Sequence, residues 1–342
     1  MSLEDLTDVE HVRARPLMYI GTTGFFGLVH YFVSAVNLVL ERSPKWIAVE
    51  AVEDGFRIRS DANLCIERNE SNELLPFERF RKEKHGLGLD GPMLNALSSR
   101  LTVRTSLGEQ VIRLVFDRGR LIDESQADGD SSVTEFEFAP DSSIFTVSHF
   151  SSYNFDSYFR RISFLNPSTV FSFTESNTTR TYHSSNGIRG MFDCVASPYQ
   201  ILHEPIHFRH VEGKLDLEIV WGYHSWEGDV VWSFINKGRA VEGGTHDQGL
   251  AAAFRSLAKE VGLTKREARL QNGVIAIMSI IYPDAVWEGC LKARIGSKEL
   301  ETMVHNTVVE QSLKWIDSHQ GVREQMAEMQ TFCFPDMWIA AR

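Results

Sequence analysis

The sequence predicts an α+β fold in two domains, from three observations. Apolar and polar residues alternate around tight turns in "WIAVEAVEDGFRIRSD" and "LTVRTSLGEQVIRLVFDRGR", which indicates antiparallel hairpins. An apolar pattern at helical spacing, "GLVHYFVSAVNLVLER", precedes them. Farther along, the strand "DVVWSFINKG", a helix and the apolar strand "GVIAIMSIIYPD" follow one another, as is typical of a βαβ crossover. At 342 residues the chain is long enough for two cores.

The helix of this crossover follows the Gly-rich turn "EGGTH". We expect Thr245 to cap it and Gln248, three residues later, to complete a capping box. Gly262 is the expected stop. A second long helix is expected over residues 297–317. The apolar face of the first helix carries Leu250, Phe254, Leu257 and Val261.

The composition excludes several classes of protein. With 35 basic and 46 acidic residues, the formal net charge is −11, which disfavours direct binding to nucleic acid. No stretch is apolar and long enough for a membrane span, and the charged amino terminus does not resemble a signal peptide. Four scattered cysteines without a CxxC pair favour free thiols and a cytoplasmic location.

Six segments, in order, carry a resemblance to a known family. They are "VRARPLMYIGTTGFFGLVH", "HGLGL…LNALS", "FLNPSTVFSFTE", "NGIRG", "EGGTH" and "WEGCLKARIGSKEL". The chain resembles the ATPase half of the DNA gyrase B and topoisomerase IV family. That resemblance implies a GHKL (Bergerat-type) α/β sandwich followed by a transducer domain. It also implies an amino-terminal arm that crosses to a partner subunit, and no DNA-cleaving segments.

In the family, a helix glutamate is the general base that polarises the water attacking the γ-phosphate, and an asparagine four residues later holds Mg²⁺. Aligned without gaps, this chain has Ser34 and Leu38 at these two positions. A shift of one residue would make Asn37 the metal ligand and place Val33 at the base position. The base is absent in either alignment, because neither side chain is a carboxylate.

The family's adenine-reading aspartate and its neighbouring glycines correspond here to "RSDANLCIE". The aspartate position carries Ser60, and a shift of one residue would bring Asp61 there instead. Ala62 and Leu64 replace glycines that let the backbone approach the nucleotide. Asn63, between them, is retained as a candidate ligand-binding residue.

Other elements of the family's site persist in part. His85, Gly86 and Gly88 match the Gly-rich lid, although the segment before them is much shorter than in the family. Thr134 matches a threonine near adenine. Lys292 remains of the three-residue loop that reaches the γ-phosphate in the family.

These residues make up the candidate site. Ser34, Asp61 and His85 are candidate acid, base or nucleophilic groups. Each is weighed against a structural role: Ser34 filling the space of a glutamate, Asp61 holding a turn, His85 shaping the lid. No metal site and no cofactor is expected. The candidate ligand-binding residues are Asn37, Ser60, Asn63, Gly86, Gly88, Thr134 and Lys292.

The expected organisation is a GHKL-like domain with its arm over residues 1–210, a transducer-like domain over 211–321, and an apolar tail over 322–342 that docks on another surface. The favoured function is a homodimeric small-ligand-binding or assembly protein that has lost ATP hydrolysis. The alternative is a repurposed enzyme, for example a biosynthetic one, that uses the remodelled pocket for a substrate other than ATP. Residual ATP binding without turnover is a third option.

Overall fold

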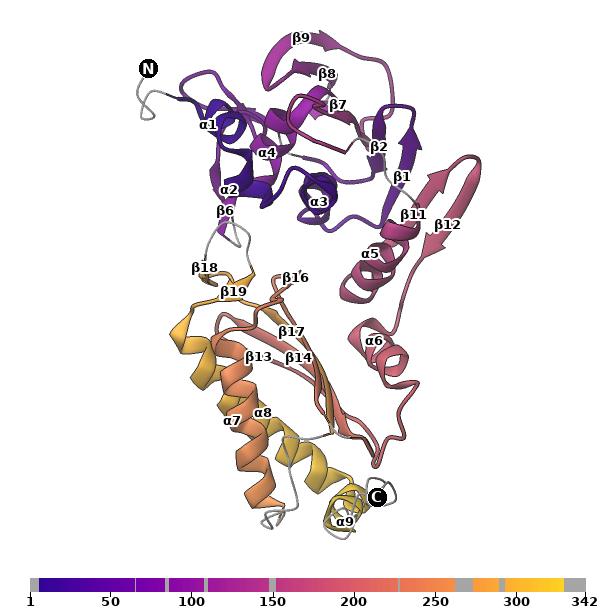
Figure 1. Ribbon diagram of the computed structural model, residues 1–342, viewed down its shortest axis with the longest axis vertical. Coiled ribbons are helices and arrows are strands. Elements are labelled where there is room, and N and C mark those ends of the chain that lie inside the picture. Colours follow the sequence, from indigo (N-terminus) through magenta and orange to yellow (C-terminus); the bar gives the residue numbers. More distant parts are fainter. Residues whose placement is uncertain are drawn as a thin grey trace, which may run out of the picture. The chain divides into compact units, whose positions relative to one another are not determined.

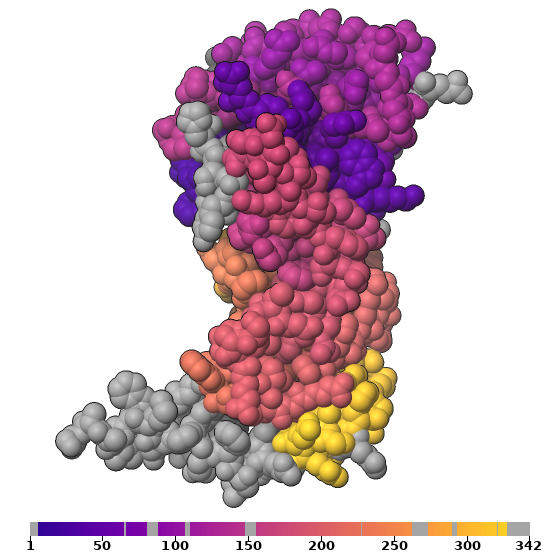
Figure 2. Space-filling model, turned by 90° about the vertical axis from the view of Figure 1, so that its right-hand side faces the viewer, coloured from indigo at the N-terminus to yellow at the C-terminus, as the bar shows by residue number. Residues whose placement is uncertain are grey.

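The computed structural model describes residues 6–64, 66–83, 86–107, 110–147, 152–226, 228–261, 273–288 and 293–328, and the others are grey in Figures 1 and 2. The chain divides into two compact units, Met1–Ser185 and Asn186–Arg342. Among the described residues, no helix is long and apolar enough to cross a membrane.

Unit one is built on an eight-stranded mixed sheet with the strand order β12-β11-β1-β2-β10-β7-β8-β9. Its helices are α1 (Asp8–Ala14), α2 (Pro16–Ile20), α3 (Phe25–Leu40), α4 (Asp90–Leu97) and α5 (Ser152–Leu165). The strands of the sheet are β1 (Trp46–Val52), β2 (Gly55–Ser60), β7 (Ser98–Leu107), β8 (Gln110–Asp117), β9 (Arg120–Gln126), β10 (Thr134–Pro140), β11 (Val170–Glu175) and β12 (Thr178–Tyr182). Two small hairpins lie outside it, β3 (Glu67–Arg68) with β4 (Leu74–Leu75) and β5 (Arg81–Glu83) with β6 (Gly86–Gly88).

The core of unit one lies between this sheet and helices α3, α4 and α5 (Figure 1). It is strongly aromatic: Phe32 of α3 lies within 4.4 Å of Phe155 of α5 and 4.8 Å of Phe56 of β2, measured between ring centroids. Aromatic pairs at such distances add to the free energy of burying their large apolar surfaces. Helix α3, which carries several of the candidate residues, is therefore fixed firmly against the sheet.

Unit two has a five-stranded sheet with the order β13-β14-β17-β15-β16, covered by α7 and α8 on one face and α6 on the other (Figure 1). Its elements are α6 (Gly187–Ala196), β13 (Ile206–Glu212), β14 (Leu215–Tyr223), β15 (Val230–Ile235), β16 (Gly238–Arg239), α7 (Thr245–Glu260), β17 (Val274–Ile281), β18 (Trp287–Glu288), β19 (Arg294–Ile295), α8 (Lys298–Ser318) and α9 (Gln320–Glu328).

The expected crossover is confirmed, because β15 pairs in parallel with β17 and α7 lies between them in the chain. The expected capping box is wrong. Helix α7 has Gly244 as its N-cap, with no capping side chain, and the Thr245 hydroxyl donates instead to the Ser297 carbonyl at 2.6 Å. A tertiary acceptor thus competes successfully with the local one. Gly262 lies outside the described residues.

The boundary between the units falls earlier than the expected residue 210. Helix α6 packs on β14 and β17, and β13 pairs along its length with β14, so residues 187–212 belong to unit two. The start of the expected tail is a helix, α9, whose Val322 and Met326 are buried in the core of unit two. The tail beyond residue 328 lies outside the described residues.

Candidate functional site

At Ser34, which the sequence alignment places at the family's catalytic-base position, the hydroxyl is used inside its own helix. Its Oγ donates to the Tyr31 carbonyl at 2.7 Å, and the residue is only 1% exposed. Leu38, one turn later, is buried in the same core, and Asn37 lies half-buried beside it. This face of α3 therefore presents an apolar surface and a hydroxyl that is already bonded, rather than a carboxylate and a metal-binding amide.

The end of β2 places Ser60 and Asp61 in different surroundings. Ser60 is fully buried opposite Thr134 of β10, and its Oγ accepts a hydrogen bond from the Ala62 N–H at 3.1 Å. Asp61 accepts from the Lys45 N–H at 2.9 Å and the Trp46 N–H at 3.3 Å, at the start of β1. The Asp61 carboxylate thus has a structural role at the start of β1, whereas the alignment of Ser60 with the adenine-reading position stays a prediction.

The other polar candidates at this end of the sheet also bond within the protein. The Oγ1 atoms of Thr134 and Thr105 lie 2.8 Å apart and are buried, and Asn63 donates to the Ser106 hydroxyl at 3.1 Å. The two buried threonines are thus matched to each other, which is what buried polar groups require for stability, whereas Asn63 is exposed.

Apolar side chains occupy the positions where the family has glycine. Ala62 and Leu64 are buried and belong to the same hydrophobic cluster as Leu38. A glycine lets a backbone come close to a ligand because it has no side chain, and burial of an alanine and a leucine removes that freedom. The described residues here form packed core.

The Gly-rich segment has a strand conformation rather than an open phosphate loop. Gly86 and Gly88 of β6 pair with Glu83 and Arg81 of β5, so this backbone is engaged in a hairpin. His85 and Lys292 lie outside the described residues, and their assigned roles stay predictions. No group of three or more histidine, cysteine or acidic side chains suited to a metal occurs within the described ranges.

Two grooves lie away from these positions. One, of about 640 Å³, lies in unit one between α1 and the turn that joins β8 to β9. The other, of about 270 Å³, lies in unit two between α7 and β15. Neither is lined by a candidate residue of the sequence analysis.

Comparison with known proteins finds similarity to gyrase B over most of the chain. The DNA gyrase B family model matches residues 187–332, a range that begins where unit two begins. The gyrase B protein of Thermotoga maritima is 27% identical, over 93% of this chain and 57% of its own length. The gyrase B protein of Campylobacter jejuni is 25% identical, over 93% of this chain and 46% of its own length. The chain thus spans about half the length of these relatives.

Solved structures agree on the fold. The 43K ATPase domain of Thermus thermophilus gyrase B, solved with an aminocoumarin, superposes with a TM-score of 0.78 at 21% identity, covering 97% of this chain and 96% of its own. The ATPase region of Saccharomyces cerevisiae topoisomerase II gives a TM-score of 0.69 at 12% identity, covering 96% of this chain and 98% of its own.

The chain is thus similar to gyrase B proteins over nearly its whole length, and the gyrase B family model matches its second unit. The predicted GHKL-like fold class is confirmed by these neighbours.

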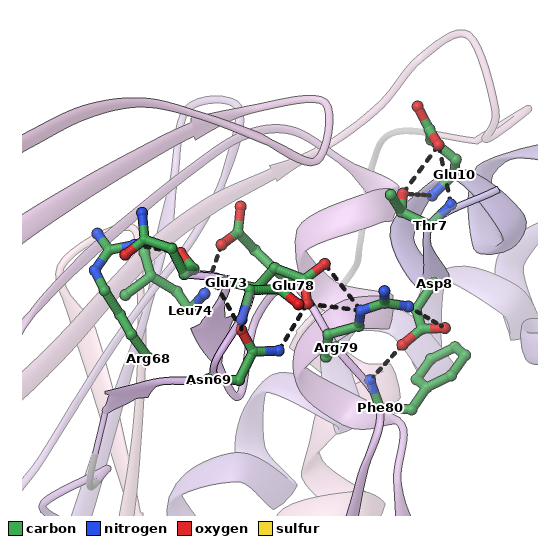
Figure 3. Close-up of polar contacts among 12 residues, drawn as sticks. Thr7, Asp8, Glu10, Arg68, Asn69, Glu73, Leu74, Glu78, Arg79 and Phe80 are labelled. Carbon is green, nitrogen blue, oxygen red and sulfur yellow. Dashed lines mark hydrogen bonds and ion pairs between the residues drawn. The ribbon is translucent and has the colours of Figure 1, made fainter. Parts of the chain in front are cut away.

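Residues 1–5 of the expected arm lie outside the described residues, and its crossing to a partner stays a prediction; residues 6–14 are described. Helix α1 is docked on its own unit: the Asp8 carboxylate accepts from the Phe80 N–H at 2.9 Å and lies 3.5 Å from Arg79, which also bonds Glu73 (Figure 3). At the other end of the helix, Arg13 forms an ion pair of 2.7 Å with the buried Asp141. Residues 6–14 thus pack in cis.

A sequence signal for this helix was present and was missed. Thr7 is followed three residues later by Glu10, and the two form a complete capping box (Figure 3). The groove in unit two has no comparable signal, because its lining residues come from four separate elements, β15, β16, α7 and β17, and the loops beside them.

Proposed function

We propose that this gyrase B-like protein has lost ATP hydrolysis and acts as a homodimeric small-ligand-binding or assembly protein. One observation carries the proposal: Ser34 stands at the position of the general base, with its hydroxyl bonded to the Tyr31 carbonyl. A serine hydroxyl is not ionised near neutral pH and cannot take the part of a carboxylate base. Positioning and activating the attacking water is what this chemistry requires of the protein.

The packing around Ser34 supports the same conclusion. Leu38, Ala62 and Leu64 are buried together in the core of unit one, at positions where a nucleotide site needs a metal ligand and open backbone. Restoring the glutamate alone would therefore not restore an ATP site.

An exposed apolar surface supports self-association. Leu17 and Met18 of α2 are 58% and 43% exposed, and Phe26, at the start of the adjoining α3, is 76% exposed. Contiguous apolar surface of this kind marks protein contact sites in soluble proteins. We propose that a second copy of the chain covers it.

The alternative, a repurposed enzyme in the former nucleotide pocket, gains nothing from the described geometry. The Ser34, Ser60 and Thr134 hydroxyls are buried and each bonds to a protein group, which favours a structural role over contact with a substrate.

The loss of hydrolysis is tested by a steady-state phosphate-release assay with Mg²⁺ and ATP, using the ATPase half of a bacterial gyrase B as the positive control. We expect no release above the rate without protein. Release that Ser34→Ala abolishes would overturn the proposal. Dimerisation is tested separately by sedimentation velocity, and a monomer at every concentration would refute that part.

A further inference from the structure

The groove in unit two is built from one side of a strand and one face of a helix. Alternate residues Asp229, Val231 and Ser233 line it from β15 and the residue before that strand. Leu250 and Phe254 of α7, one helical turn apart, form much of its apolar wall. Its dimensions suit a few side chains of an extended segment.

Within the described residues, the first half of the strand beside this groove has an unpaired outer edge. β15 pairs with β17 over its whole length, but β16 pairs only with Phe234 and Ile235. The Ser233 carbonyl accepts from the Ala240 N–H at 3.3 Å on the outer side, whereas the Asn236 N–H donates to Ile280 of β17 on the inner side.

Because backbone directions alternate along a strand, the N–H and C=O of Val231 point outward, as the Ser233 carbonyl does. Within the described residues, no strand lies beside Val231 on that side. Unpaired backbone groups at a sheet edge are a template for another strand.

One carboxylate oxygen in the groove lacks a hydrogen-bond partner. The Oδ1 atom of Asp247 is buried without one in the described structure, although the side chain as a whole is 31% exposed. Asp229 adds a second, exposed carboxyl, whose Oδ1 accepts from the Val274 N–H at 2.9 Å. His246 Nε2 lies 3.2 Å from Asp247 Oδ1 and 2.8 Å from the Ser233 Oγ, but burial lowers the pKa of this histidine and so favours its neutral form. A carboxylate oxygen that is shielded from water gains stability when a cation or a hydrogen-bond donor meets it.

Arg239 also lines the groove, but within the described residues it forms no ion pair with Asp247. Its guanidinium lies over the Trp232 ring, 4.8 Å from the centroid. Trp232 alternates with Val231 and Ser233 along β15, so its side chain projects from the opposite face of the sheet. The groove thus lacks a cation for Asp247 from this arginine.

We propose that the groove binds an extended segment of a partner protein, which pairs with β15 at Val231 and places a lysine or arginine side chain at Asp247. The residues two positions before and after this lysine or arginine carry apolar side chains, which pack on Leu250 and Phe254. A second copy of this chain is a poorer occupant, because it carries a net charge of −11 and the same carboxylates.

Every residue of this site belongs to unit two, so the proposal is independent of whether unit one hydrolyses ATP.

The test uses the full chain and a fluorescein-labelled hexapeptide, Thr-Val-Thr-Lys-Thr-Val, followed by fluorescence anisotropy at low salt. We expect saturable binding with a dissociation constant below about 1 mM. Val231→Pro removes the outward N–H at an edge position that tolerates proline, and Asp247→Asn removes the charge. Each should weaken binding about tenfold or more, whereas Glu212→Gln, on the opposite edge of the same sheet, should not change it.

Changes to the peptide test the same contacts without altering the fold of the protein. Glutamate in place of the lysine, or N-methylation of the lysine and of the two residues flanking it, should each abolish binding. The proposal is overturned if the unmodified peptide does not bind, if these changes leave binding intact, or if Val231→Pro instead abolishes self-association of the chain.

Discussion

A hydroxyl in the middle of a helix has an acceptor within reach, the carbonyl three or four residues earlier, and Ser34 uses it. A glutamate at this position would need either water or a cation. The surrounding side chains include Leu38 and the aromatic core, which supply neither. At the scale of single residues, then, the surroundings of Ser34 can accommodate a hydroxyl group but not a charged carboxylate.

This match predicts opposite outcomes for two substitutions at one position. Ser34→Ala removes one hydrogen bond and should lower the free energy of unfolding by about 1 kcal/mol. Ser34→Glu buries a charge without a partner and should cost about 3 kcal/mol or more. Urea denaturation of the two variants measures both. Equal stabilities would mean that an open polar cavity adjoins Ser34, contrary to the packing described.

A buried histidine predicts how stability varies with pH. His203 donates from Nδ1 to the Glu204 carbonyl and accepts the Tyr223 N–H at Nε2, and burial lowers its pKa to about 4. The unfolded chain, with a histidine pKa near 6.5, binds a proton that the folded chain does not. Above about pH 6.5 the histidine is neutral in both states, so it does not lower the free energy of unfolding. As the pH falls from about 6.5 to about 4, protonation of the unfolded chain lowers the free energy of unfolding progressively, by as much as about 3 kcal/mol.

Urea denaturation between pH 7.5 and 4.5 measures this effect. We expect His203→Asn to lower stability at pH 7.5 yet to lose less of it on acidification than the wild type. His183→Asn, at an exposed histidine of unit one, is the matched control and should keep the wild-type pH dependence. A His203→Asn variant with the wild-type pH dependence would refute the assignment.

At the scale of elements, periodic apolar patterns predicted the bounds of helices well, whereas hydrogen bonds to residues far away in the sequence were not predicted. The second long helix, expected over residues 297–317, is α8 and spans Lys298–Ser318, because its buried stripe is visible in the sequence. The start of α7 was predicted with the wrong cap, because the acceptor of the Thr245 hydroxyl lies 52 residues away. The anchoring of α1 by Asp8 and Arg79 escaped prediction for the same reason.

The "EGGTH" turn needs its second glycine for a reason that can be tested. Gly244 has a φ of +147°, and a Cβ atom there would lie 2.3 Å from the Ile295 carbonyl oxygen. Gly244→Ala should therefore lower the stability of unit two by more than about 2 kcal/mol.

Gly213→Ala is the matched control, since Gly213 also has a positive φ but has no atom within 4 Å of the added Cβ. We expect it to cost about 1 kcal/mol. Thermal or urea unfolding compares the two, and equal losses would show that the approach to Ile295 does not constrain this turn.

At the scale of the whole molecule, the family and fold could be predicted from six short segments in order, while the site could be predicted only as a set of losses. The position of Asp61 depended on a one-residue alignment, and the structure assigns its carboxylate to the backbone of β1. The groove beside Val231 could not be predicted, since its carboxylates and its free edge meet only through the crossover. A single sequence records which side chains changed, but not which of them then found new partners.

The proposed dimer is tested by changing the exposed apolar surface of α2 and α3. Leu17→Lys combined with Phe26→Lys should shift the sedimentation coefficient from dimer to monomer, because charge desolvation opposes burial of this surface. Ile122→Lys combined with Val211→Lys changes two similarly exposed apolar residues elsewhere and should leave the dimer intact. Dimers that persist in the first variant would place the interface on another surface.

The most direct test of the central claim is single-turnover hydrolysis, with the protein in excess over radiolabelled ATP and Mg²⁺ present. Because every ATP molecule can then be bound, even one slow round of cleavage would be detected. We predict no labelled phosphate beyond that formed in buffer, both for the wild type and for Ser34→Ala. Phosphate that forms with the wild type and disappears with Ser34→Ala would contradict the account.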